Sequence, residues 1–205
     1  MGHFLVQYLQ ARGYTTEKIG LPNSPNRFNV YAYLGGQRKT RVCLTAHMDT
    51  VPPHILFRIE GDTIFGRGTN DDKGPMAAQI MAVEELRAAG DIRARGDVAF
   101  LFVVGEEAGG PGMLEMGPWS TTMGLSWESI VFAEPTESKL AQGHKGHMVF
   151  RLDVQGVACH SGYPELGRSA IATMLAVLQE RYENVYSSFS SSSFNLPWWT
   201  QLSAS

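Results

Sequence analysis

The chain has 205 residues, of which 43% are hydrophobic and 18% are charged, and its 17 basic and 20 acidic residues give a formal net charge of −3. This composition is typical of a globular protein with ample material for a core, and the small negative charge argues against nucleic acid or an anionic membrane as a partner. Two cysteines make no disulfide framework, no apolar run has the length of a membrane span, and no signal peptide is visible, so we expect a cytoplasmic protein.

Helical and extended patterns alternate along the first two thirds of the chain. Apolar residues recur at helical spacing in residues 4–9, and this helix is expected to stop near Gly13. A second helix is predicted at residues 75–89, ended by Gly90. Apolar strands separated by helices predict an α/β fold with a largely parallel sheet. The predicted strands are 28–34, 41–46, 97–104 and 129–133, with a hairpin formed by 55–60 and 63–65 around Gly61-Asp62.

The last third of the chain has a different character. An alternating strand is predicted at residues 147–154 and a helix at about 164–181, which together could open a second, smaller layer or domain. No charged residue follows Glu183, and eight of the last 19 residues are serine. Such a serine run is typical of a flexible segment, although Trp198 and Trp199 are unusual beside one.

Side chains that can bind a metal follow three of the predicted strands, and two more lie in the glycine-rich loop before the long helix. In open α/β sheets, ligands bind outside the carboxyl ends of the strands. Carboxylates gathered there repel one another unless a cation is present, so a divalent metal site would resolve the conflict. The side chains concerned are those of His47, Asp49, Asp71, Asp72, Glu106, Glu107 and Glu134.

The spacing of these groups suggests separate roles. His47 and Asp49 lie two residues apart, so in extended backbone the imidazole can bind a metal while the carboxylate fixes its tautomer. The adjacent side chains of Glu106 and Glu107 diverge, so one can bind metal while the other handles a proton. Zinc suits a mixed nitrogen and oxygen shell and lowers the pKa of a bound water enough for it to act as a nucleophile.

Each of these signals also has a simpler structural explanation. A lone His-x-Asp is common as a strand-end hydrogen bond, and acidic residues such as Glu106 and Glu107 are favoured at a helix N-terminus. Asp71-Asp72 could cap a helix that begins at Lys73. Their joint occurrence at consecutive strand ends is what favours the metal site.

Five segments of the chain, in this order, resemble the motifs of a large family of dinuclear zinc hydrolases. The family comprises the acetylornithine deacetylases, succinyl-diaminopimelate desuccinylases, aminoacylases and glutamate carboxypeptidases, which are M20-like metallopeptidases. The ordered set is highly specific and spans most of the chain. The segments are TAHMDTVP at 45–52, GRGTNDDKG at 66–74, GEE at 105–107, EPT at 134–136 and ACHSGYP at 158–164.

The resemblance implies an aminopeptidase-like (zinc-peptidase) α/β catalytic domain of three layers, with an inserted α+β lid domain that usually dimerises. It implies two Zn²⁺ ions, with Co²⁺ as an alternative, and hydrolysis of an amide bond in an N-acyl amino acid or small peptide. By the same resemblance, His47 and Glu134 are ligands of the first metal, Asp71 is the bridging carboxylate, and Glu107 is a ligand of the second metal.

The resemblance also implies three catalytic roles. Glu106 corresponds to the general base that deprotonates the bridging water, and Asp49 to the residue that orients His47. His160 corresponds to the lid histidine that helps bind the scissile carbonyl or its oxyanion.

The chain departs from the family pattern after the lid. Family members return to the catalytic domain there and supply a late histidine to the second metal, whereas no histidine follows His160. We therefore expect a partial catalytic domain at residues 1–143, the start of a lid or dimerisation domain at 144–183, and a Ser-rich uncharged tail at 184–205. Two hypotheses remain: a metal-dependent amidohydrolase, and a catalytically inactive truncated remnant of one.

Overall fold

The computed structural model describes residues 1–92, 96–143 and 151–190. The chain divides into two compact units, Met1–Gln142 and Gly143–Ser205, and each is described by itself. Among the described helices, none has the length and apolar character needed to cross a membrane.

The first unit is built around a five-stranded sheet with the strand order β1-β2-β6-β3-β7. Strands β3, β6 and β7 run parallel to one another, whereas β1 and β2 pair antiparallel, and β2 pairs antiparallel with β6. The parallel half therefore brings the carboxyl ends of three strands to one edge. The strands are β1 Tyr14–Leu21, β2 Ser24–Leu34, β3 Val42–His47, β6 Val98–Val103 and β7 Ser129–Phe132.

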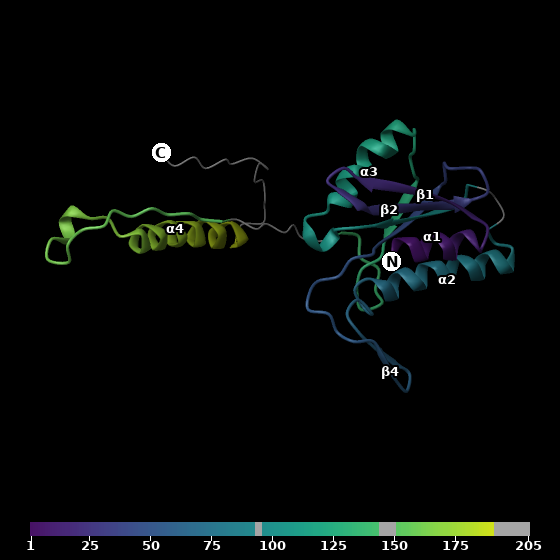
Figure 1. Cartoon of the computed structure of the whole chain (residues 1–205), viewed down its shortest axis with the longest axis horizontal. Coiled ribbons are helices and arrows are strands. Elements are labelled where there is room, and N and C mark those ends of the chain that lie inside the picture. Colours follow the sequence, from purple (N-terminus) through teal and green to yellow (C-terminus); the bar gives the residue numbers. More distant parts are fainter. Residues whose placement is uncertain (93–95, 144–150, 191–205) are drawn as a thin grey trace. The chain divides into compact units, whose positions relative to one another are not determined.

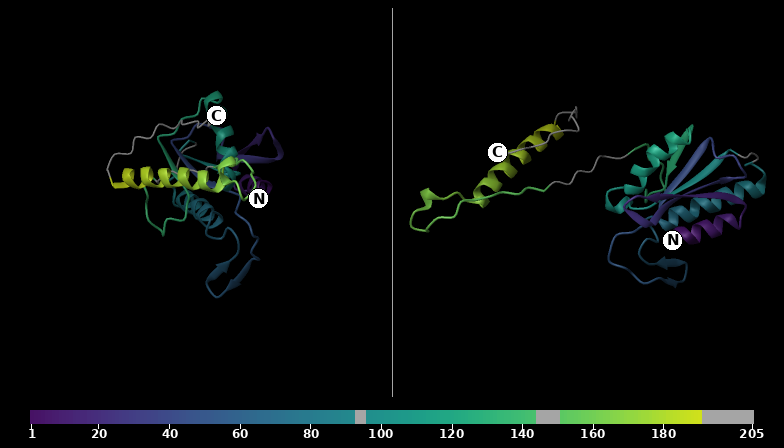
Figure 2. Two further views of the ribbon diagram at one scale, coloured as in Figure 1. Left: turned by 90° about the vertical axis from the view of Figure 1, so that its left-hand side faces the viewer. Right: turned by 45° about the horizontal axis from the view of Figure 1, so that its top comes forward.

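Helices cover both faces of this sheet, which gives three layers (Figures 1 and 2). Helices α1 (Gly2–Gln10) and α2 (Lys73–Ala89) lie on one face and α3 (Pro111–Thr122) on the other. Strand β6 is buried along its whole length because its side chains alternate between the two cores. Phe100 and Phe102 join the core beneath α1 and α2, and Leu101 joins the core beneath α3. The predicted three-layer α/β class is confirmed.

The prediction of a largely parallel sheet was wrong for the β1–β2 side. Strand β1 was not predicted, and it returns into β2 through the two residues Pro22-Asn23, a connection that only antiparallel strands allow. Helix α3 was also not predicted, because its sequence PGMLEMGPWSTT contains two glycines and two prolines, which disfavour helix on propensity alone. Packing of Met116 and Trp119 against the sheet supports it instead.

The other elements of the first unit lie close to their predicted positions. Helix α2 ends at Gly90, whose φ of 81° is left-handed, as expected of a glycine C-cap. Strands β4 (Arg58–Glu60) and β5 (Thr63–Phe65) form the predicted hairpin around Gly61-Asp62.

The second unit contains the 3-10 turn η2 (Pro164–Leu166) and helix α4 (Ala170–Ser190). The helix predicted from residue 164 therefore begins later, and an antiparallel bridge between Val157 and Arg168 precedes it. The strand predicted at 147–154 is not formed at 151–154, and its first four residues lie outside the described part of the chain. Of the predicted Ser-rich tail, residues 184–190 continue α4 and 191–205 lie outside the described residues.

Candidate metal centre

The carboxyl ends of β3, β6 and β7 bring side chains from distant parts of the sequence to one edge of the sheet. His47 is the last residue of β3 and lies in register with Val103 of β6, two residues before Gly105. Glu134 follows β7, which pairs with β3 on its other side. Asp71 comes from the loop that leads into α2. Parallel pairing of the strands therefore explains why these motifs meet.

The imidazole of His47 is held in a defined orientation. Its side chain is only 2% exposed, and its Nδ1–H donates to the main-chain carbonyl of Asp49 at 3.0 Å. This bond leaves Nε2 facing Asp71, whose Oδ1 lies 2.8 Å away. Burial lowers the pKa of His47, but the Asp71 hydrogen bond and the charges of Asp72, Asp71 and Asp49 outweigh it and raise the pKa above its usual value. When His47 is neutral, the bond from Nδ1–H to the Asp49 carbonyl leaves Nε2 unprotonated and available to a metal.

Glu107 completes a group that has the donors a metal requires. One ligand atom each from His47, Asp71 and Glu107 lies within 4.8 Å of the other two. One imidazole and two carboxylates form the mixed nitrogen and oxygen set that suits zinc. The residues at this edge therefore fit the group that the sequence motifs imply.

Glu134 and Glu106 lie near this group without joining it. Burial raises the pKa of Glu134, the charge of His47 lowers it, and the charges of Glu106, Asp71 and Glu107 raise it further, with a net rise. A carboxyl group whose pKa is raised by neighbouring carboxylates lacks compensating positive charge. A cation at this edge would relieve that repulsion, which is a second indication that the donor set fits a metal.

Asp72 has a structural role that differs from helix capping. It is fully buried at the N-cap position of α2, but its side chain forms no cap hydrogen bond. Its Oδ2 instead accepts the backbone N–H of His47 at 2.9 Å, and burial raises the pKa of the carboxyl to about 7. Asp72 therefore joins the start of α2 to the end of β3, next to the candidate metal ligands. The sequence placed Asp72 at this edge but gave no signal for this contact.

The carboxylate of Asp49 points at the loop after β6. Its Oδ1 accepts the backbone N–H groups of Gly105 at 2.7 Å and Glu106 at 3.2 Å, and its Oδ2 accepts that of Glu107 at 3.3 Å. The distance from Oδ1 to His47 Nδ1 is longer, at 3.8 Å. Asp49 thus contacts the imidazole of His47 mainly through its main-chain carbonyl. Its side chain contacts the backbone of residues 105–107, the loop that carries Glu106 and Glu107.

A buried asparagine that sequence reasoning did not select holds both ends of the same loop. Asn29 of β2 is fully buried; its Oδ1 accepts the N–H of Val104 at 3.1 Å, and its Nδ2 donates to the carbonyl of Gly112 at 2.7 Å. A Cβ at Gly112 would collide with the Val104 carbonyl, so only glycine allows this approach. A polar residue in an otherwise apolar stretch of strand was the one available signal.

His160 belongs to the second unit, where it begins a tight turn. The N–H of Gly162 donates to its Nδ1 at 3.0 Å, and the ring lies 5.9 Å from the ring of Tyr163. These contacts orient the imidazole within its own unit. Its role toward the group at His47 stays a prediction.

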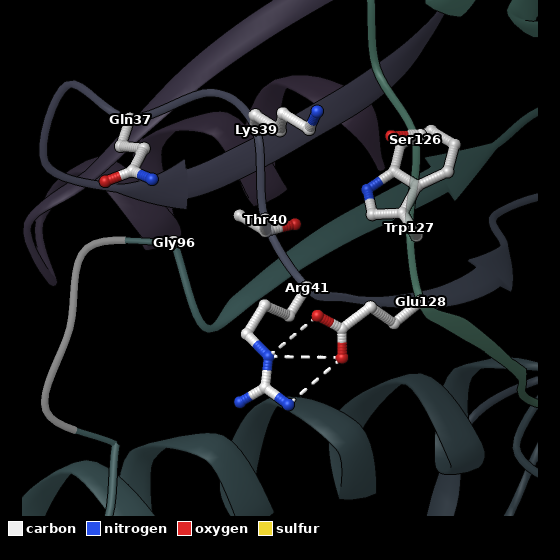
Figure 3. Close-up of a pocket in the computed structure, with 8 residues that line it drawn as sticks. All are labelled: Gln37, Lys39, Thr40, Arg41, Gly96, Ser126, Trp127 and Glu128. Atoms are coloured by element: carbon white, nitrogen blue, oxygen red, sulfur yellow. Dashed lines mark hydrogen bonds and ion pairs between the residues drawn. The ribbon is translucent and has the colours of Figure 1, made fainter.

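The larger of two cavities in the first unit lies at the opposite edge of the sheet, where the parallel strands begin. It has a volume of about 420 Å³ and contains the exposed ion pair between Arg41 and Glu128, beside Trp127 (Figure 3). A smaller cavity of about 220 Å³ reaches Asp49 at the carboxyl edge. Neither cavity is lined by His47, Asp71 or Glu107.

Comparison with known proteins places these motifs in context. The profile of a family described as "Peptidase family M20/M25/M40" matches residues 43–201. A peptidase M20 domain-containing protein of Schizosaccharomyces pombe is 49% identical over 173 residues, which cover 84% of this chain and 42% of the relative. A probable carboxypeptidase of Ajellomyces capsulatus is 42% identical over 197 residues, covering 87% and 44% respectively. The chain thus spans less than half the length of these curated relatives.

Solved structures share the fold at lower sequence identity. An aminopeptidase from Bacillus cereus aligns with a TM-score of 0.55 and 20% identity, over 83% of this chain and 48% of its own. A metallo-carboxypeptidase of the M20 family from Sulfolobus solfataricus aligns with a TM-score of 0.53 and 20% identity, over 64% and 31%. Both alignments support the aminopeptidase-like architecture.

Proposed function

Because the chain belongs to peptidase family M20/M25/M40 and is an enzyme by family, we propose that it forms the metal-binding part of a hydrolase that cleaves an amide bond of a small peptide or N-acyl amino acid. The observation that carries this proposal is the convergence of His47, Asp71 and Glu107 at the carboxyl edge of the sheet. A bound zinc ion supplies Lewis-acid chemistry, which polarises a scissile carbonyl and acidifies water.

The residues of this chain divide the remaining work. His47, Asp71 and Glu107 would hold the metal, with Glu134 as the further ligand that the motif resemblance implies, and the Asp49 carbonyl keeps the Nδ1 of His47 occupied so that Nε2 would be free to bind it. The carboxylate of Glu106 accepts a proton from the attacking water and delivers it to the leaving amine as the C–N bond breaks. Its position next to Glu107 and its exposure to solvent support this role.

Several finer features belong to the same proposal. The names of the fungal relatives favour a carboxypeptidase, which releases a C-terminal amino acid, over a deacetylase. The motif resemblance supports two Zn²⁺ ions, with Co²⁺ as an alternative, and a role for His160 in binding the scissile carbonyl. It also supports dimerisation of complete family members through the lid domain, and the small negative charge of the chain argues against nucleic acid or an anionic membrane as a partner.

Zinc titration and hydrolysis assays on the full 205-residue chain test the proposal, with Glu106→Gln as the matched variant. We expect both proteins to bind zinc in calorimetry. Any release of amino acids from a panel of dipeptides and N-acyl amino acids should fall in Glu106→Gln, because general-base catalysis contributes about 10²- to 10⁴-fold. Binding without turnover in either protein would favour the inactive-remnant hypothesis. A wild type that binds no zinc would refute the proposed site.

A further inference from the structure

The loop that follows β6 forms a pocket of backbone N–H groups at Gly105, Glu106 and Glu107. Gly105 has a left-handed backbone, with φ 80° and ψ 23°, and the 3-10 turn η1 (Glu106–Ala108) follows it directly. A left-handed residue followed by right-handed ones points successive N–H groups toward one spot, which is an anion-binding arrangement known as a nest. The nest therefore requires an anion, and glycine is the residue that gives its shape.

The anion in this nest is the side chain of Asp49. Its two carboxylate oxygens accept all three N–H groups at 2.7, 3.2 and 3.3 Å, and the side chain is only 18% exposed. Hydrogen bonds to an ionised acceptor are roughly twice as strong as neutral ones. Asp49 thus joins the end of β3, which carries His47, to the backbone that carries Glu106 and Glu107.

We propose that Asp49 is a positioning residue for the Glu106–Glu107 loop, acting through its carboxylate on the backbone nest, whereas the imidazole of His47 is oriented by the Asp49 main chain. The proposal rests on the proposed function, in which Glu107 binds metal and Glu106 moves a proton. Because Asp49 fills the nest, neither glutamate carboxylate has to cap its own turn. Both carboxylates are then left for the metal and the water.

This assignment differs from the role that the motif resemblance implies, and the two roles make different predictions. The 3.0 Å bond to His47 Nδ1 comes from a main-chain carbonyl, which any residue at position 49 supplies. The carboxylate is 3.8 Å from Nδ1 and closer to all three loop N–H groups. Replacing the carboxylate should therefore disturb Glu107 more than His47.

Amide hydrogen exchange, followed by NMR on the full chain without metal, tests the nest directly. In the wild type, the amides of residues 105–107 should exchange at least about 10-fold more slowly than those of the exposed turn Gly61-Asp62. In Asp49→Asn they should exchange about 10- to 100-fold faster than in the wild type, the range expected for hydrogen bonds to a charged group. Residues 98–103 of β6 should not change, and neither should any of these amides in the control Glu128→Gln.

Amides at 105–107 that exchange as fast as those of Gly61-Asp62 in the wild type would overturn the proposal. If Asp49→Asn fails to fold, this wild-type measurement is sufficient as the test. Unchanged exchange in a folded Asp49→Asn would also overturn it. The exchange measurement needs neither metal nor substrate. The role of Asp49 can therefore be refuted while the proposed hydrolase function stands, and the hydrolase function can be refuted while the role of Asp49 stands.

A double-mutant cycle on Co²⁺ affinity distinguishes the two routes to the metal. Asp49→Asn should weaken binding about 10- to 100-fold, as is typical of partners that orient a ligand. In a Glu107→Gln background the same change should cost at most about twofold, because the ligand that Asp49 positions is already lost. A full effect that persists in that background would show that the carboxylate acts through His47, and would refute the inference.

Discussion

The two edges of the central sheet differ in how their charges are balanced. At the amino edge, the exposed Arg41 side chain binds both oxygens of Glu128 at 3.0 to 3.2 Å, beside the larger cavity. At the carboxyl edge, burial and neighbouring carboxylates raise the pKa values of Asp72 and Glu134. The candidate site therefore lies at the edge where carboxylates lack positive partners, not at the edge with the larger of the two cavities. Ionisable groups with perturbed pKa values often gather at functional sites.

Removing the imidazole at the carboxyl edge should have the largest effect on metal binding. We expect His47→Ala to lower zinc affinity by at least about 100-fold, beyond the 10- to 100-fold typical of residues outside the coordination shell. The fold should persist, because Asp72 binds the backbone N–H of residue 47 rather than its side chain. Calorimetric titration measures the change. An equal loss of zinc affinity in His47→Ala and in Glu128→Gln, at the amino edge, would show that the two edges do not differ in metal binding.

Replacing Asn29 tests how much its buried hydrogen bonds at the carboxyl edge contribute to the stability of the fold. Asn29→Ala removes two buried hydrogen bonds and leaves the Val104 N–H and the Gly112 carbonyl unpaired. It should lower the free energy of unfolding by about 2–3 kcal/mol in urea denaturation. Asn26→Ala, an exposed change on the same strand, should stay within about 0.5 kcal/mol. Similar values for the two variants would mean that Asn29 does not hold the loop.

Two glycines of α3 should respond differently to alanine. A Cβ at Gly112 would meet Asn29 Oδ1 at 2.6 Å as well as the Val104 carbonyl, so Gly112→Ala should destabilise the fold by about 1–3 kcal/mol. Gly117 has no atom beyond its chain neighbours and its own helix backbone within 4 Å of its Cβ position, but Pro118 follows it and opposes a Cβ on a helical residue, so Gly117→Ala should change the stability by no more than about 1 kcal/mol. Thermal unfolding of both variants checks the pair. A neutral Gly112→Ala would show that the end of the loop is less tightly held than its contacts indicate.

The amino edge should be the least sensitive. The side chains of Arg41 and Glu128 are 68% and 64% exposed, and solvent-exposed ion pairs contribute little to stability. Glu128→Gln should therefore leave the urea midpoint unchanged at physiological salt, with a small decrease only at low ionic strength. A large decrease in the urea midpoint at physiological salt would mean that the ion pair at the amino edge contributes substantially to stability.

The sequence predicted where the candidate ligands gather, because the ends of strands can be recognised in it. His47, Glu107 and Glu134 each follow an apolar run, and the parallel pairing of those runs needs only the alternation of strands and helices. Strand β1 and helix α3 were beyond prediction, because packing rather than propensity forms them.

The contacts of Asp49, Asp72 and Asn29 were equally out of reach for sequence reasoning. Each of these side chains binds backbone groups at least 25 positions away in the chain. A backbone N–H or carbonyl leaves no trace in residue identity. The sequence therefore indicated the candidate ligands but not the backbone contacts that hold them in place.

The hydrogen bonds from Asn29 to Val104 and Gly112 fix both ends of the loop 105–111. The loop could therefore be replaced as a unit. Its two ends are tied to a strand that contributes none of the proposed ligands, so their spacing does not depend on what lies between them. Loops of the same length from related enzymes could then be grafted between these anchors to vary the reactive groups while the sheet stays unchanged. Such a transplant would need to retain Gly105, whose left-handed backbone receives Asp49.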